Sequence, residues 1–189
     1  MKKFDLISKL REWDKQNERK IIAIDGRCAS GKTTLASYIA EHIPCDVVHT
    51  DDFFLPFEMR TSERLSKIGG NIDRERLLSE ILVPLKSGKS YTYSKFSCKS
   101  GLITQGEKIQ PRKITIVEGS YSCHPDLFDF YDMHIFLSVD KETQKERILQ
   151  RNKDNADAFF SKWIPLEEKY FSECDIKEKC EIVLSQEVV

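Results

Sequence analysis

The fold is decided by residues 26–33, GRCASGKT, which match in full the pattern G-x-x-x-x-G-K-T/S of a phosphate-binding loop. Glycines let such a backbone curl so that successive N–H groups point into one concavity, and a helix that starts near Lys32 adds the positive end of its dipole. Lys32 would neutralise the β- and γ-phosphate oxygens, and the Thr33 hydroxyl would take one position on an octahedral magnesium ion. The stretch therefore predicts a site for a nucleoside triphosphate and Mg²⁺.

The segments that flank this loop are predicted to be a strand and a helix. Ile21–Asp25 is a short apolar run, and the pattern turns helical from Lys32 to about Ile43, where Pro44 ends it. A further helix is predicted over 3–17. Short strands that alternate with helices predict a parallel sheet covered on both faces, with ligands beyond the carboxyl ends of its strands. The other predicted strands are 47–49, 114–117, 133–139 and 181–184.

The composition indicates one cytoplasmic domain, residues 1–189. With 40% hydrophobic residues the chain can bury a core, and its apolar runs are far shorter than the ~20 residues that span a bilayer. Charges from Asp5 to Glu12 interrupt any signal-peptide core, and the six cysteines, without zinc spacing, are expected to be free thiols. The net charge of −1 gives no overall attraction to nucleic acid. We expect no nucleic-acid partner and no membrane association, and the sequence leaves a homo-oligomer open.

The segment between the second and third predicted strands, residues 52–113, is longer than a crossover needs. It contains a Gly-Gly-Asn turn at 69–71, a predicted helix over 73–86 and an extended stretch over 91–98 with alternating aromatic residues. These aromatic residues would form either a stacking wall for a substrate or ordinary core. They are Tyr91, Tyr93 and Phe96.

Acidic residues follow two of the predicted strands. Asp51 comes after strand 47–49, where its carboxylate could accept the proton of a hydroxyl that attacks phosphorus, or could instead cap a helix or turn. Its neighbour Asp52 is a weaker candidate for the base. Glu118 follows strand 114–117, a position from which a carboxylate can hold Mg²⁺ directly or through water.

Two arginines lie on the helix predicted after the fourth strand. Arg147 and Arg151 are four residues apart and so share one helix face, from which they could close over the phosphates as the transferring group gathers charge. Glu142 and Glu146 lie near enough to pair with them instead, on a solvated face.

With these positions fixed, the chain resembles the uridine kinase-like branch of the P-loop kinases, which includes uridine-cytidine kinases, nicotinamide riboside kinases, pantothenate kinases and phosphoribulokinases. The resemblance extends from Ile21 to about Phe171. It is carried by the loop, by TDDFF at 50–54, VEG at 117–119 and NID at 71–73, and by Arg147 and Arg151. The chain departs from uridine kinases where they carry a proline and a base-contacting histidine, because it has RER at 74–76 and YTYSKF at 91–96.

The resemblance implies an α/β, three-layer P-loop nucleoside triphosphate hydrolase fold with a five-stranded parallel sheet in the order 2-3-1-4-5. It divides the single domain into a nucleotide-binding core (18–51 and 112–189), an acceptor-binding excursion (52–111) and a lid over about 145–158. It also implies ATP and Mg²⁺ as cofactors and a small-molecule hydroxyl acceptor as partner.

The same resemblance assigns roles to individual residues. Asp51 would be the general base, with Lys32, Arg147 and Arg151 acting on the transferring group. Magnesium would be held by Thr33, Glu118 and Asp51. The acceptor would contact Asp51, Phe54, Asp73 and Tyr93. The nucleotide would contact Gly26, Arg27, Cys28, Ala29, Ser30, Gly31, Lys32, Thr33 and Thr34.

Two other functions compete with a small-molecule kinase. A nucleotide-dependent switch specific for guanine usually carries Asn-Lys-x-Asp, whereas residues 152–155 read NKDN. A nucleoside-monophosphate kinase needs cations for the acceptor's phosphate, as does a kinase for a phosphorylated sugar. Arginines in the excursion could supply them or could be surface residues. These arginines are Arg60, Arg64, Arg74 and Arg76.

Overall fold

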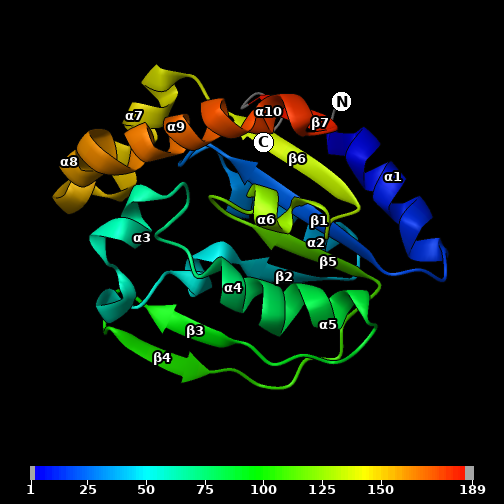
Figure 1. Cartoon of the computed structure of the whole chain (residues 1–189). Helices are drawn as coiled ribbons and strands as arrows, with labels where there is room; N and C mark the ends of the chain where they lie inside the picture. Colours follow the sequence, from blue (N-terminus) through cyan, green and yellow to red (C-terminus); the bar gives the residue numbers. More distant parts are fainter. Residues whose placement is uncertain (1–2, 186–189) are drawn as a thin grey trace.

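The computed structural model describes residues 3–185, and its centre is a sheet of five parallel strands (Figure 1). The strands lie in the order β2-β5-β1-β6-β7, and each neighbouring pair is parallel. The predicted α/β fold and the strand order 2-3-1-4-5 are therefore confirmed. The strands are β1 (Lys20–Gly26), β2 (Cys45–His49), β5 (Ile114–Glu118), β6 (Met133–Ser138) and β7 (Ile182–Ser185).

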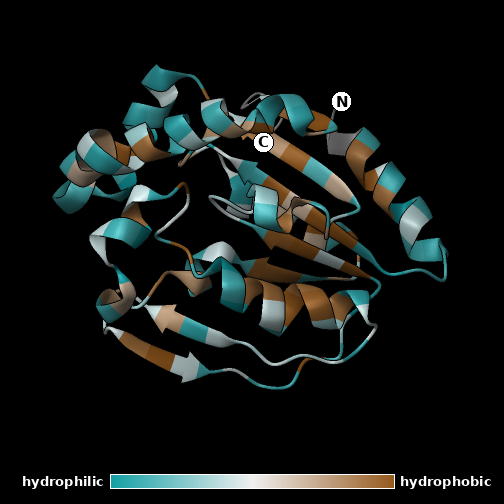
Figure 2. Cartoon of the chain, viewed as in Figure 1, coloured by the Kyte–Doolittle hydropathy of each residue, from teal (hydrophilic) through white to brown (hydrophobic). Residues whose placement is uncertain are grey.

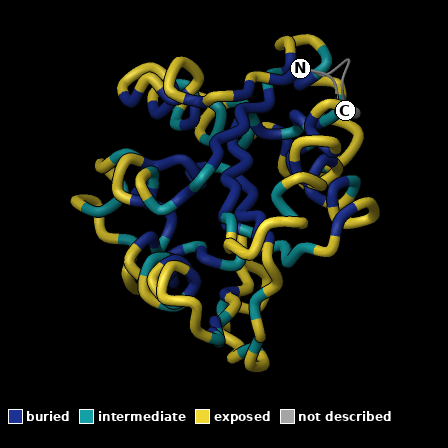
Figure 3. The backbone as a smooth tube through the Cα atoms, turned by 90° about the vertical axis from the view of Figure 1, so that its right-hand side faces the viewer, coloured by how far each residue is buried: buried dark blue, intermediate teal, exposed yellow. Residues whose placement is uncertain are grey.

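The central strands are apolar along almost their whole length because helices cover both faces of the sheet. Every residue of β5 is buried, and so is every residue of β1 after Lys20. Figure 2 shows much of these strands as hydrophobic, and Figure 3 shows the centre of the molecule as buried. The carboxylates Asp25 and Glu118 lie near the carboxyl ends of β1 and β5, beside the phosphate loop.

Two helices cover one face of the sheet. They are α1 (Lys3–Lys15) and α2 (Lys32–His42), and the predicted helix over 3–17 therefore ends two residues early. Their apolar side chains, among them Leu6, Leu10, Leu35 and Ile39, form one core cluster with residues of β1, β5, β6 and β7. This packing fixes the direction of α2, whose first turn faces the phosphate loop.

The opposite face is covered by helices from the excursion and from the last part of the chain. The predicted helix over 73–86 is present as α4 and α5, joined by a π turn at Leu78–Leu82. Pro84 lacks the N–H that a regular helix would bond to the carbonyl four residues earlier, and the widened turn precedes it. The helices of this face are α4 (Arg74–Leu77), α5 (Val83–Lys86), α6 (Pro125–Phe128), α9 (Ile164–Cys174) and α10 (Ile176–Lys179).

The rest of the excursion lies beyond β2 (Figure 1). It consists of α3 (Ser62–Ser66) and an antiparallel hairpin of β3 (Ser94–Ser97) and β4 (Leu102–Gln105). The expected extended stretch over 91–98 supplies β3, whereas β4 was not predicted. Tyr91, Tyr93 and Phe96 are buried, with Tyr91 and Tyr93 in the main core. The alternation therefore marks core rather than an open stacking wall.

The chain between β6 and α9 forms a cap over the phosphate loop. It comprises α7 (Lys141–Arg151), a turn at Lys153–Asn155, α8 (Ala156–Ala158) and a π turn at Phe159–Trp163. Ile148 and Ala156 pack on Cys28 of the loop. The segment predicted as a lid, 145–158, belongs to this cap. Within residues 3–185, no helix has the length and apolar character needed to cross a membrane.

Candidate active site

The phosphate loop joins β1 to α2, and its backbone conformation requires glycine at positions 26 and 31. Gly26 has a φ of 132°, and a Cβ there would overlap the backbone carbonyl of Leu137 on β6. Gly31, with a φ of 98°, is the N-cap of α2 in the left-handed region. The loop therefore curls between two strands and a helix N-terminus, which is the geometry expected for binding phosphate.

Lys32 spans the concavity of the loop. Its Nζ donates to the carbonyl oxygens of Gly26, at 2.7 Å, and Arg27, at 3.0 Å, and the residue is 9% exposed. The loop's own carbonyls hold the ammonium group over the place where the motif expects phosphate oxygens. The predicted neutralisation of phosphate oxygens by Lys32 stays a prediction, and it would require Nζ to exchange these carbonyl contacts for phosphate.

One hydroxyl oxygen and one carboxylate oxygen meet beside the loop, and such a pair is suited to binding magnesium. Thr33 Oγ1 donates to Glu118 Oε1 at 2.9 Å, and His49 Nδ1 lies 2.5 Å from the same oxygen. The bond to Glu118 raises the pKa of His49. Mg²⁺ prefers oxygen ligands and usually combines one or two from protein with phosphate and water. The residues present therefore fit the ion that the sequence predicted.

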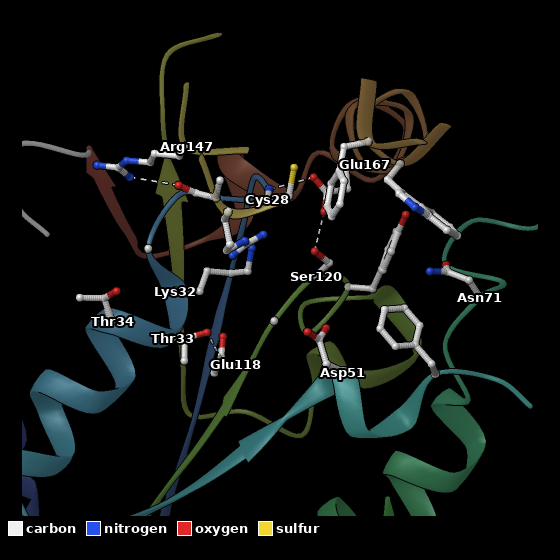
Figure 4. Close-up of a pocket in the computed structure, with 18 of the residues that line it drawn as sticks. Cys28, Lys32, Thr33, Thr34, Asp51, Asn71, Glu118, Ser120, Arg147 and Glu167 are labelled. Carbon is white, nitrogen blue, oxygen red and sulfur yellow. Dashed lines mark hydrogen bonds between the residues drawn. The ribbon is translucent and has the colours of Figure 1, made fainter. Parts of the chain in front are cut away.

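Asp51 follows β2 in a short 3₁₀ turn, Thr50–Phe53, and faces the same cavity as Lys32 (Figure 4). Burial raises the pKa of its carboxyl above the ordinary value, and the Lys32 ammonium partly offsets the effect. A carboxylate that is opposite the phosphate loop and more basic than usual has the properties of a general base.

Arg147 and Arg151 lie on the cap, and both line the cavity. Arg147 Nη1 donates to the carbonyl of Ala29 in the loop at 3.0 Å, whereas Arg151 Nε donates to Asn152 Oδ1 at 2.8 Å. Both residues thus contribute to the cavity wall, and the Arg147 guanidinium contacts the phosphate loop (Figure 4). Their action on the transferring group stays a prediction.

One cavity of about 720 Å³, at the carboxyl ends of the strands, is lined by Lys32, Thr33, Asp51, Glu118, Arg147 and Arg151. A smaller cavity of about 330 Å³ adjoins it and shares the walls Asn71, Tyr121 and Trp163. Among the residues predicted to bind nucleotide, metal or acceptor, the large cavity is lined by Cys28, Ala29, Gly31, Lys32, Thr33, Thr34, Asp51, Phe54 and Glu118.

The other residues that were predicted to bind nucleotide or acceptor do not line the large cavity. Asp73 caps α4 by accepting the N–H of Arg76 at 3.1 Å, and Tyr93 donates its hydroxyl to Asp52 Oδ2 at 3.2 Å. Arg27 points to Glu168 rather than into the cavity. Gly26 and Ser30 form the floor of the loop without lining the cavity. That Asp73 and Tyr93 contact the acceptor stays a prediction.

The four arginines of the excursion are engaged in holding its backbone. Arg64 forms a two-pronged bond with Glu75, at 2.7 Å for each nitrogen, and Arg74 donates to the carbonyl of Gly69 at 2.9 Å. Arg60 donates to the carbonyl of Leu55 at 2.7 Å, and Arg76 to that of Asp52 at 3.1 Å. None of the four lines the described cavities. Nothing in their contacts favours a nucleoside-monophosphate kinase.

Sequence reasoning missed two buried carboxylates next to the loop. Asp25 accepts hydrogen bonds from the N–H groups of Gly26 and Cys123 and from the hydroxyl of Tyr170, and burial raises its pKa to about 6. Glu167 accepts the N–H of Cys28 and lines the cavity. A signal existed for Glu167, since it falls on the apolar stripe of its helix between Trp163 and Tyr170.

The fold and the loop define a P-loop kinase. The model of the phosphoribulokinase / uridine kinase family matches residues 21–156. The chain therefore belongs to that family, as the sequence resemblance indicated.

Individual relatives agree with this assignment. The chain is 27% identical to a uridine kinase of Ligilactobacillus salivarius, over 74% of this chain and 69% of that protein. It is 28% identical to nicotinamide riboside kinase 1 of Homo sapiens, over 67% of this chain and 62% of that protein. A solved structure described as a possible uridine kinase of Bacillus stearothermophilus superposes with a TM-score of 0.73 at 19% identity, over 96% of this chain and 97% of that one. The last likeness shows the fold alone.

Proposed function

We propose that the protein transfers the γ-phosphoryl group of ATP to a hydroxyl group of a small metabolite, with Mg²⁺ bound at Thr33 and Glu118. One observation carries the proposal most directly. The Asp51 carboxylate, whose pKa is raised by desolvation, lies in the same cavity as the phosphate loop and its lysine. A protein that only binds or hydrolyses the nucleotide does not need a base placed for an organic hydroxyl.

The residues of the cavity divide the work. Loop N–H groups and the N-terminus of α2 hold the phosphates, and Lys32 balances their charge. Asp51 accepts the proton of the attacking hydroxyl and orients its oxygen. Bound Mg²⁺ would neutralise charge on the transferring phosphates. Arg147 and Arg151 face the charge that builds up on the phosphoryl group.

The acceptor would occupy the side of the cavity away from the phosphate loop. Phe54, Asn71, Tyr121 and Trp163 line that part of the wall, and they offer two aromatic faces, a phenol ring and an amide. This combination suits a small polar molecule with a flat or apolar portion, such as a nucleoside or a sugar-like compound. The acceptor hydroxyl would then meet Asp51 from this side.

The test follows ADP release from ATP·Mg²⁺ with a panel of nucleosides, sugars, sugar phosphates, pantothenate and glycerate. We expect at least one acceptor to raise turnover above the bare hydrolysis rate. Asp51→Asn should then lower the acceptor-dependent rate by about 10²- to 10⁴-fold, the usual contribution of a general base. An Asp51→Asn enzyme that keeps full acceptor-dependent turnover would exclude the assigned role.

A further inference from the structure

A carboxylate forms part of the wall of the phosphate cavity, where its charge would repel a triphosphate. Glu167 lies near the start of α9 and is 5% exposed. Burying an unpaired carboxylate is costly, so its partners matter. Its Oε2 accepts the backbone N–H of Cys28 at 2.9 Å, and its Oε1 accepts the hydroxyl of Ser120 at 2.5 Å. Figure 4 shows both bonds.

The two partners of Glu167 belong to the two halves of the catalytic site. Cys28 is the third residue of the phosphate loop, and Ser120 comes two residues after Glu118, the candidate magnesium ligand. The bonds therefore join the loop that follows β1 to the segment that follows β5. One side chain spans both segments, so its length sets the separation between them.

The loop is fixed at this point from both sides. Gln144 of α7 donates to the carbonyl of Cys28 at 3.0 Å, while Glu167 of α9 takes the N–H of the same residue. Glu168, the next residue of α9, accepts two bonds from Arg27, at 2.5 and 2.9 Å. Helices α7 and α9 thus hold consecutive residues of the phosphate loop.

We propose that Glu167 is a positioning residue that fixes the phosphate loop at Cys28 relative to the magnesium side at Ser120. The catalytic consequence rests on the proposed function, because alignment of the phosphoryl group, Mg²⁺ and acceptor matters for transfer. Loss of this contact leaves the remaining loop amides and Lys32 able to hold ATP. It mainly misaligns the group to be transferred, and a misplacement on the ångström scale can cost about 10²-fold in rate.

The test compares Glu167→Ala, Glu167→Gln and a control on the same helix, Glu173→Ala, whose carboxylate is half exposed and 3.8 Å from Lys169. Hydrogen–deuterium exchange of the loop amides reports the contact itself, and steady-state kinetics report its consequence. We expect Glu167→Ala to speed exchange at Cys28 by about tenfold or more, as for loss of a buried hydrogen bond. It should lower kcat by about 10- to 100-fold and change the KM for ATP less than threefold.

Rescue by the conservative variant separates positioning from other roles. The side-chain amide introduced by Glu167→Gln keeps an oxygen that can accept the Cys28 N–H, so this variant should restore slow exchange and most of kcat. If Glu167→Ala exchanges and turns over like the Glu173→Ala control, the proposal is wrong. It is also wrong if kcat falls while exchange at Cys28 stays slow, since Glu167 would then act directly on a substrate.

The role of Glu167 can still be tested if Glu167→Ala does not fold or if the wild-type chain shows no phosphoryl transfer. If Glu167→Ala does not fold, Glu167→Asp replaces it, because a side chain one methylene shorter cannot reach both partners, and the same exchange and kcat changes are expected. If the wild-type chain transfers phosphate to no acceptor, the proposed function fails. The exchange measurement still decides whether Glu167 holds the loop.

Discussion

Asp51 and Asp52 are adjacent, yet the fold gives them different surroundings. Asp51 faces the cavity, and burial raises the pKa of its carboxyl. Asp52 accepts the Tyr93 hydroxyl and pairs with Lys95 at 2.9 Å. The difference follows from the 3₁₀ turn after β2, which points successive side chains in different directions. Only the first of the two is available to an acceptor.

The raised pKa of Asp51 predicts the acidic side of the pH–rate profile. A general base acts in its ionised form, so kcat/KM should fall as the pH drops through the pKa of Asp51. Because desolvation raises that pKa, the fall should begin at a higher pH than it would for an aspartate with an ordinary pKa. The negative charge of Asp52 contributes to the rise.

Asp52→Asn therefore tests the direction in which the acidic limb of the pH–rate profile moves, at saturating Mg²⁺. Removal of its charge should stabilise ionised Asp51 and move the acidic limb to lower pH, while kcat on the plateau changes little. A limb that moves to higher pH, or a plateau rate that drops as far as in Asp51→Asn, would contradict the division of roles between the two residues.

At the scale of the element, the turn that precedes α4 depends on one arginine. Arg64 donates to the carbonyls of Gly70, at 3.3 Å, and Ile72, at 3.0 Å, on either side of Asn71. Asn71 lines both cavities. The partner of Arg64, Glu75, has its pKa lowered to about 2 by that ion pair. The arginine thus holds the backbone around Asn71, which lies on the proposed acceptor side, without itself lining either cavity.

We predict that Arg64→Met raises the KM for the acceptor several-fold and leaves the KM for ATP unchanged. Two carbonyls lose a donor, at a cost of about 1–3 kcal/mol, which for a chain of this length corresponds to a melting temperature roughly 2–12 °C lower. The exposed ion pair adds only ~0.5 kcal/mol. Glu63→Gln, an exposed change on α3, serves as control. Equal effects on both KM values would place the role of Arg64 elsewhere.

The pH dependence of this variant has a defined sign. The pKa of Glu75 is depressed in the folded state, so the stability that its pair with Arg64 provides is present above its ordinary pKa of 4.5. It is lost as the pH falls toward about 2. The difference in free energy of unfolding between wild type and Arg64→Met should therefore shrink over that range, in equilibrium denaturation at each pH.

Elements with a strong local pattern could be predicted from the sequence, and those that depend on distant contacts could not. β1, β5 and the loop have apolar runs and glycines that permit little else. The hairpin strand β4 is exposed at every residue and shows no alternation, so its pairing with β3 carries no sequence signal. Glu167 is 139 residues from Cys28, and no local rule relates them.

The same contrast explains the acceptor side. Phe54 follows a strand end and lies in the cavity as expected, whereas Asp73 becomes a helix cap and Tyr93 a core residue. Their orientation depends on how the excursion folds back on β2, which short-range patterns do not encode. The strand ends therefore define the half of the site that we propose binds nucleotide, and tertiary packing defines the half that we propose binds the acceptor.

At the scale of the whole molecule, one ligand should stabilise much of the structure. The cavity wall draws on the loop after β1, α2, the segments after β2 and β5, α7 and α9, so a nucleotide in it would contact nearly every layer. A ligand that binds only the folded chain adds about 2.7 kcal/mol at a hundredfold excess over its Kd. For a chain of this size, the melting temperature should rise by roughly 5–11 °C with ATP·Mg²⁺.

Three variants separate the causes of that rise. Lys32→Met should remove most of the rise in melting temperature, because the phosphate charge then lacks its ammonium partner. Asp51→Asn should keep the whole rise, since the base serves the acceptor and not the nucleotide. Glu118→Gln should make the rise nearly independent of Mg²⁺, and EDTA should have the same effect on the wild type. A Lys32→Met protein with an undiminished rise would mean that ATP binds outside the loop, because no other ammonium group lines the large cavity within the described residues.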